Sequence, residues 1–196
     1  MHNLIQSCGL IVALLLSTLF SQSVAAQRPK PLFPDGDYYL IYKWSSWPDR
    51  YLTGITEASY DKSGLVDVTF QPKSYNWETG QLQRWRFRNW DYDGTIYIQS
   101  VRSYRYLGSG HKFNCSVPVT DKRNCATSLL GSGQKFKLVE HYGRKGRYLL
   151  QLDGYGGNLY KPILGPAMGP DNKPLETAVM THSYYGRDMT FEIKKA

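Results

Sequence analysis

A strand-like segment occurs three times along this chain, as QLQRWRFR at 81–88, QKFKLV at 134–139 and MTFEIK at 189–194. Apolar and polar residues alternate in each segment, which is typical of a β-strand with one buried face. Trp85, Phe136 and Phe191 take the same place in the three segments, 51 and then 55 residues apart. A repeat of this length predicts a fold assembled from similar units.

Short segments rich in β-forming residues lie between these three, separated by Gly, Pro, Asn and Asp. No segment has a convincing helical pattern, and 75–80 is interpreted as a loop, Pro48-Asp49 as a turn and 158–160 as a strand of the third cycle. The sequence therefore predicts an all-β fold with three pseudo-repeats of four strands. The residues expected in its core are Trp85, Phe87, Phe136, Phe191, Leu52, Leu107 and Leu159.

The start of the chain has the features of a targeting segment. An apolar run at 10–20 is too short to cross a bilayer as a helix, and small residues suited to cleavage follow it up to Ala26. The sequence predicts a cleaved signal peptide at 1–26, an extended proline-containing lead-in at 27–34 and one domain at 35–196. We therefore expect a secreted, extracellular protein, with a retained anchor as the alternative.

Two cysteines, Cys115 and Cys125, remain in the expected mature chain, and an even number in an exported protein predicts one disulfide bond. Asn114 begins a formal glycosylation sequon, and whether it is used stays open. The formal net charge is +8. A basic exported protein is suited to acidic partners such as sulfated or uronic polysaccharides, although the charge also favours solubility alone.

Three cycles of four strands, each ending near a Gln-x-aromatic sequence, resemble the β-trefoil and in particular the ricin-type (QxW) lectin domains. The signature is intact at 83–85, relaxed at 134–136 and lost in the third cycle, where Met189 replaces the glutamine. The resemblance implies a six-stranded barrel capped by three hairpins, and carbohydrate binding. The galactose sites of these lectins use an aspartate after the second strand of a repeat. Thr53, Gly108 and Tyr160 stand there in this chain, so a sugar site here must be built differently.

A weaker resemblance concerns the segment DGDYYLI at 35–41, which is similar to the opening of Kunitz soybean-type inhibitors. These proteins share the trefoil architecture, and the resemblance implies a protease as partner. The candidate inhibitory loops are 75–80 and 165–174.

Carbohydrate binding uses flat aromatic faces in exposed loops, and burial of such rings under the loops is the alternative. The candidates beside turn residues are Trp47, Tyr75, Trp77, Tyr104, Tyr155, Tyr184 and Tyr185. Binding of an acidic ligand would use Arg84, Arg86 and Arg88, which are about 6.6 Å apart on one face of a strand. A solvated outer face is the alternative interpretation of this row.

Catalysis has no motif in this sequence. His111, His141 and His182 do not pair at a metal-ligand spacing, and no Gly-x-Ser-x-Gly elbow occurs. We therefore expect a non-enzymatic protein with no cofactor, no metal, no membrane span and no nucleic acid as partner. The leading prediction is a secreted lectin-like protein that binds carbohydrate. A trefoil protease inhibitor and an extracellular-matrix or growth-factor-like protein that binds acidic polysaccharide are the alternatives, and the oligomeric state stays open.

Overall fold

The computed structural model divides the chain into two units, 1–30 and 31–196, and the second is described here. The described residues are 31–196 without 45–46, 55–65, 90–92, 110–124, 131–132, 154–161, 170, 172 and 182–188. The predicted signal peptide, Cys115, Leu159, Tyr155 and Tyr184 lie outside them, and so does the side chain of Cys125. No helix in the described part is long and apolar enough to cross a membrane.

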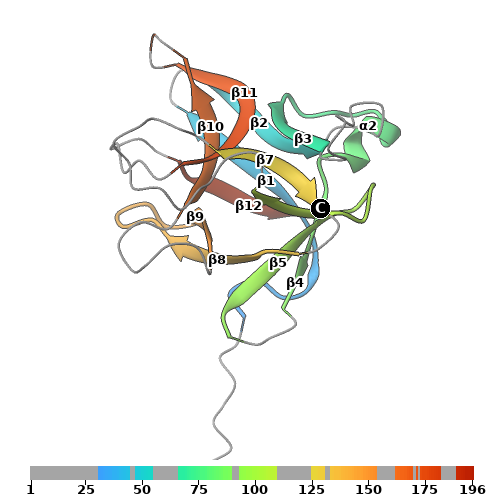
Figure 1. Cartoon of the computed structure of the whole chain (residues 1–196), viewed down its shortest axis with the longest axis vertical. Coiled ribbons are helices and arrows are strands. Elements are labelled where there is room, and N and C mark those ends of the chain that lie inside the picture. Colours follow the sequence, from blue (N-terminus) through green and yellow to red (C-terminus); the bar gives the residue numbers. More distant parts are fainter. Residues whose placement is uncertain are drawn as a thin grey trace, which may run out of the picture. The chain divides into compact units, whose positions relative to one another are not determined.

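Strands make up most of the described chain (Figure 1). They are β1 (Gly36–Trp44), β2 (Trp47–Gly54), β3 (Val66–Gln71), β4 (Trp85–Arg88), β5 (Thr95–Ser100), β6 (Tyr106–Ser109), β7 (Cys125–Leu130), β8 (Lys135–Glu140), β9 (Arg147–Leu152), β10 (Ile163–Met168), β11 (Pro174–Thr181) and β12 (Phe191–Lys195), with one short helix, α2 (Trp77–Gln81).

Half of these strands close a barrel. Antiparallel pairing runs from β1 to β4, β5, β8, β9 and β12, and β12 pairs with β1 again. The others form the hairpins β2–β3, β6–β7 and β10–β11. Strands β3, β7 and β11 of these hairpins pair with one another in a triangle. A closed barrel capped by three mutually paired hairpins is the β-trefoil, so the predicted fold class is confirmed.

The threefold relation is also present in the register of the barrel. Trp85 lies opposite Tyr38, and Phe191 lies opposite Tyr148 in the same way. In the second lobe Phe136 takes the place of Trp85, opposite Ile96. The aromatic residue that recurs in the sequence therefore has one structural role, since its side chain is fully buried in all three lobes.

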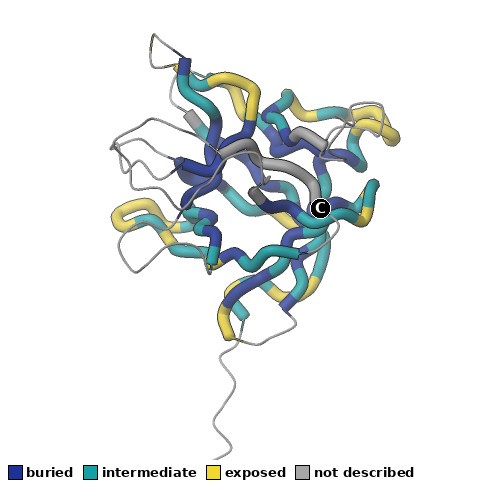
Figure 2. Tube along the Cα trace, in the orientation of Figure 1, coloured by how far each residue is buried: buried dark blue, intermediate teal, exposed yellow. Residues whose placement is uncertain are grey.

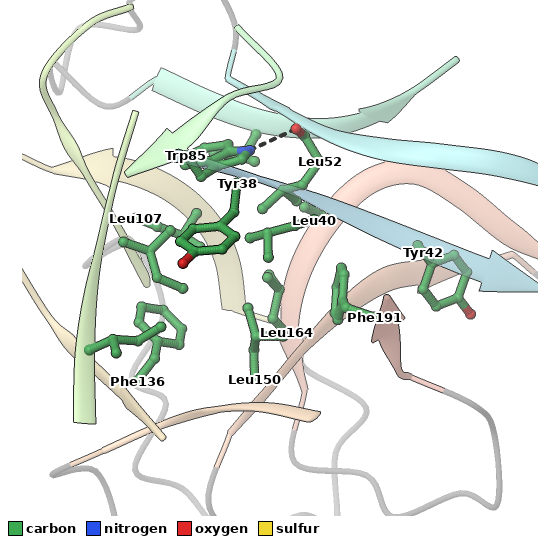
Figure 3. Close-up of a cluster of buried hydrophobic side chains, with 14 of the residues drawn as sticks. Tyr38, Leu40, Tyr42, Leu52, Trp85, Leu107, Phe136, Leu150, Leu164 and Phe191 are labelled. Carbon is green, nitrogen blue, oxygen red and sulfur yellow. Dashed lines mark hydrogen bonds between the residues drawn. The ribbon is translucent and has the colours of Figure 1, made fainter. Parts of the chain in front are cut away.

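The core lies inside the barrel and under the hairpins (Figures 2 and 3). The indole nitrogen of Trp85 donates a 2.8 Å hydrogen bond to the backbone carbonyl of Leu52, so this ring also joins β4 to β2. The predicted core residues that are described all belong to this cluster, namely Trp85, Phe87, Phe136, Phe191, Leu52 and Leu107.

The third lobe departs from the prediction at its second strand. This strand is β10, and the fully buried Leu164 pairs with Met180, as Leu52 pairs with Phe70 in the first lobe. The predicted loop 165–174 is therefore wrong over its first part. Gly and Pro usually interrupt strands. Strand β10, however, pairs with β9 only at Ile163. On the side that faces β9, Pro166 therefore lies where the strand needs no backbone N–H donor.

Two further predictions are corrected in the first lobe. Segment 75–80 was interpreted as a loop without helix, but it contains most of α2, which is too short to give a helical pattern in the sequence. The predicted turn at Pro48-Asp49 lies within β2, and the predicted strand 81–88 is shortened to β4 because Gln81 ends the helix.

The lead-in segment packs on the barrel. The ring of Phe33 makes edge contacts with Tyr38, Phe87 and Tyr148, which come from β1, β4 and β9. The side-chain amide of Asn89, directly after β4, donates a 3.1 Å hydrogen bond to the Phe33 carbonyl. Residues immediately before β1 are thus part of the folded domain.

Candidate functional site

The segment between β3 and β4 carries two exposed aromatic side chains. Tyr75 is 89% exposed and Trp77 is 73% exposed, whereas most of the other described aromatic side chains are buried or half-buried. Figure 2 shows the exposed stretch beside α2. Because apolar ring faces are costly to leave in water, a pair of them two residues apart indicates a binding surface.

The buried Gln83 fixes this segment. Its side-chain nitrogen donates to the Pro72 carbonyl at 2.7 Å and to the Thr53 hydroxyl at 3.3 Å. Its side-chain oxygen accepts from the backbone N–H of Ser74 at 2.8 Å. One amide thus joins the beginning of the segment to its end and to strand β2.

Local hydrogen bonds hold the rest of the segment. The side chain of Asn76 caps α2 by accepting from the Glu78 N–H at 2.8 Å, and the hydroxyl groups of Ser74 and Thr79 bond to each other. The Leu82 carbonyl accepts from the Gly54 N–H at 2.9 Å, which ties the end of the segment to β2. Tyr75 and Trp77 are therefore carried on a backbone that is fixed before any ligand arrives.

Lys73 adds a positive charge at the same place. Its ammonium nitrogen lies 5.3 Å from the ring centre of Tyr75 and 5.8 Å from that of Tyr39, within the range of cation–π attraction. Lys73 was not predicted from the sequence, because its contact with Tyr39 joins the segment after β3 to strand β1. We call Lys73, Tyr75 and Trp77 the aromatic ledge.

Trp47 does not belong to an exposed surface. It opens β2, packs against the core and makes an edge contact with the ring of Tyr42. The guanidinium carbon of Arg50 lies 4.9 Å from its ring centre. The prediction that Trp47 offers a free face in a loop is wrong, because both its backbone and its ring are engaged in the fold.

The arginine row is partly neutralised. Arg86 donates to the Asp37 carboxylate at 2.7 and 3.3 Å, and Arg84 donates to the same carboxylate at 3.2 Å. The hydrogen bond from Arg86 holds the pKa of Asp37 below its usual value, and the charges of Arg84 and Arg88 act in the same direction. The sequence pattern identified the face, but it did not predict that a single aspartate on β1 would hold two of the three side chains.

One exposed aromatic residue was missed. Tyr142 is 97% exposed in the turn between β8 and β9. The following Gly143 has a φ angle of +77°, so a Tyr-Gly pair at the tip of a hairpin was the signal that could have found it. Within the described residues, no group of His, Cys, Asp and Glu side chains is arranged to hold a metal ion.

Comparisons with known proteins support the fold. The chain matches no protein-family model and no curated protein sequence. Among solved structures it is similar to a ricin B-like lectin from Macrolepiota procera in complex with lactose, with a TM-score of 0.56, 13% identity, and coverage of 84% of this chain and 99% of that chain.

Two other solved structures have similar values. The agglutinin of Rhizoctonia solani has a TM-score of 0.55 and 15% identity over 84% of this chain and 97% of its own. A designed 3-fold symmetric protein, ThreeFoil, has a TM-score of 0.52 and 17% identity over 81% of this chain and 99% of its own. At these identities the likeness establishes the β-trefoil fold, and its lectin members agree with the resemblance carried by the Gln-x-Trp signature.

Proposed function

We propose that this protein is a secreted, non-enzymatic lectin-like protein that binds carbohydrate through the aromatic ledge. The observation that carries the proposal is the exposed pair Tyr75 and Trp77 on a segment fixed by a buried glutamine. The fold likeness to two lectins, one of them solved with lactose, supports it.

The physical argument concerns the cost of binding. A sugar ring has an apolar face of C–H groups, which an aromatic ring covers while the hydroxyl groups stay hydrated or bond to neighbouring polar side chains. Weak ligands of this kind gain most from a surface that is ordered in advance, because little conformational entropy is lost on binding. The hydrogen bonds of Gln83 and Asn76 supply this order.

Export and domain layout are part of the proposal. A signal peptide cleaved after Ala26 would leave the lead-in and the domain, and the contacts of Phe33 support a mature chain that retains the residues directly before β1.

The inhibitor alternative gains no support from the two loops predicted for it. One contains α2 and the other begins in β10, whereas an inhibitory loop needs an extended, protruding backbone.

The test is a glycan array with the mature protein, followed by titration of the best neutral glycan with single variants. We expect Tyr75→Ala and Trp77→Ala each to weaken binding by about tenfold, which corresponds to about 1.4 kcal/mol, with an unchanged melting temperature. Tyr142→Ala is the matched control, since it removes an equally exposed ring from another turn. Failure to bind any glycan at physiological salt, or equal losses in all three variants, would refute the proposal.

A further inference from the structure

A second surface lies on the outer wall of the barrel, where three arginines face one aspartate. Arg84 and Arg86 share the carboxylate of Asp37, and Arg88 is near enough for its charge to act on the same group. Arg84 and Arg86 remain about one third exposed, at 31% and 30% of their side-chain areas. Asp37 therefore orders the guanidinium groups without balancing their charge.

The turn between β5 and β6 is fixed against this row. The Val101 N–H donates to the Arg84 carbonyl at 3.0 Å, and the Ser100 N–H donates to the Arg105 carbonyl at 2.8 Å. The turn carries Arg102, which is exposed. One more cation is thereby placed on a rigid turn that begins beside the row.

Tyr104 in this turn has an unusual conformation. Its φ angle is +58°, and among the described residues it is the one non-glycine residue with positive φ. Its side chain is 67% exposed, so core packing does not require a tyrosine at this position. A strained backbone under an exposed side chain is an outlier that calls for a functional reason.

Tyr104 also lies beside the arginines. Its carbonyl accepts a 2.8 Å hydrogen bond from the side chain of Gln99, which is paired across the strands with Arg86. The hydrogen bond that Arg86 donates to Asp37 raises the pKa of Arg86, and the charge interaction with Tyr104 acts in the same direction. We call Arg84, Arg86, Arg88, Arg102 and Tyr104 the arginine patch.

We propose that the arginine patch is a second binding surface, for a linear polysaccharide that carries sulfate or carboxylate groups. Guanidinium groups bind such anions through two parallel hydrogen bonds. Arg84 and Arg86 are two residues apart on the strand, and their guanidinium groups converge on the Asp37 carboxylate, so the patch presents a concentrated positive charge to an anionic chain. The exposed ring of Tyr104 supplies a face for a sugar ring. The predicted export of the protein favours a polysaccharide over a nucleic acid, and the formal net charge of +8 favours polyanions in general.

The first experiment measures binding of the mature protein to heparin, which carries sulfates, and to alginate, which carries carboxylates alone, over a range of salt concentrations. Binding to either polymer that weakens as salt rises supports the proposal, and the two arms separate the anions. A DNA duplex is a third arm. Equal or tighter binding to DNA would replace the proposal with a nucleic-acid site, and no binding to any polyanion at low salt would overturn it.

The decisive variant is Tyr104→Gly. Glycine adopts positive φ without strain, so the melting temperature is expected to stay equal or to rise. Heparin binding is expected to weaken by roughly fivefold to tenfold through loss of the ring. An unchanged heparin affinity would overturn the role of Tyr104. If Tyr104 were only structural, its loss would not weaken heparin binding while the melting temperature stays equal or rises.

Two variants that each remove one exposed cation test whether the polymer binds at the arginine patch. Arg102→Ser removes a cation from the patch, and Lys145→Ser removes an exposed cation from the turn between β8 and β9. Arg102→Ser is expected to lower the slope of log affinity against log salt by about one unit, and Lys145→Ser to leave it nearly unchanged. Equal changes of the slope in the two variants would mean that the polymer is attracted by the overall charge of the protein and would overturn the location.

A double variant separates the two proposed surfaces. Heparin binding should persist in Tyr75→Ala/Trp77→Ala, and its loss there would assign the polymer to the aromatic ledge.

Discussion

The first and third lobes use different chemistry at the same buried place. In the first lobe Gln83 hydrogen-bonds to Thr53, which follows the buried leucine of β2. In the third lobe Met189 takes the place of Gln83 and packs over Gly165, which follows the buried leucine of β10. A Cβ atom added to Gly165 would lie 2.9 Å from the Met189 sulfur atom. The polar version also fixes a surface segment, whereas the apolar version fills space.

On the outer face of the barrel, an acidic and a basic residue exchange strands between the same two lobes. Arg86 follows the core aromatic of the first lobe and lies opposite Asp37. Glu192 follows the core aromatic of the third lobe and lies opposite Arg147. The three lobes thus share the packing of their core residues, whereas their surface residues differ. The aromatic ledge and the arginine patch both depend on residues that the third lobe does not share.

The largest effect is expected at the core aromatic, which is Trp85 in the first lobe and phenylalanine in the other two. Trp85→Phe leaves a cavity and deprives the Leu52 carbonyl of its donor, so we expect a loss of about 2–4 kcal/mol in the free energy of unfolding. Chemical denaturation of the mature protein measures it. Trp47→Phe is the control and should cost less, because Trp47 lies only at the margin of the core. Equal losses would show that the first lobe does not depend on its indole.

The next effect comes from giving the first lobe the residue of the third. Gln83→Met removes the partners of the Pro72 carbonyl and the Ser74 N–H, so we expect a loss of about 1–3 kcal/mol in the free energy of unfolding. Glycan binding at the ledge should also weaken, because the segment is no longer held in place. Gln71→Met is the control, since Gln71 is half-exposed and should cost under about 0.5 kcal/mol. Stable protein with unchanged glycan affinity would separate Gln83 from the ledge.

The repeat was predictable from the sequence because a buried strand face leaves a direct pattern. Trp85, Phe136 and Phe191 are large, regularly spaced and flanked by polar residues, so their pattern is visible in the sequence alone. The second strand of the third lobe was misplaced because Gly165 and Pro166 have low β-propensity. Tertiary packing against Met189 and the open side of β10 outweigh that propensity.

The candidate site was only half predictable. Tyr75 and Trp77 are visible as aromatic residues among turn formers, and whether such residues are exposed depends on the fold around them. The charge on the arginine row depends on Asp37, which precedes Arg84 by 47 residues. Strand pairing brings them together, and one sequence alone does not state which strands pair.

A smaller effect is expected where the third lobe depends on the absence of a side chain. Gly165→Ala pushes on Met189, a flexible residue, so we expect a loss of about 1 kcal/mol in the free energy of unfolding. In a Met189→Ala background the same change should cost less, and the difference measures the coupling. Gly80→Ala is the control, since its added Cβ meets only the Ser74 carbonyl at 3.6 Å. If the losses in the free energy of unfolding caused by the two substitutions simply add, the contact between residue 165 and Met189 makes no measurable contribution to stability.

The smallest effect concerns the charged pair of the first lobe. The pKa of Asp37 lies below its ordinary 3.8 because of the hydrogen bond from Arg86, so its ionised form stabilises the folded domain above about pH 4. This contribution is lost as the pH falls through the lowered pKa. Asp37→Asn should therefore destabilise the domain at pH 6, and the difference should shrink as the pH falls through the lowered pKa, as measured by thermal unfolding over a series of acidic pH values. A difference independent of pH would show that the carboxylate acts through its shape.

The reversed pair of the third lobe sharpens this comparison. Burial alone would raise the pKa of Glu192, but hydrogen bonds and charges from Lys194 and Lys43 together lower it. Glu192→Gln should thus show the same direction of pH dependence as Asp37→Asn. The two variants should differ in polyanion binding. Asp37→Asn leaves the arginines without their negative partner and should tighten heparin binding. Glu192→Gln changes a charge on β12 that lies opposite Ile41 and contacts Lys43 instead of the arginines, and it should leave the salt slope of heparin binding nearly unchanged.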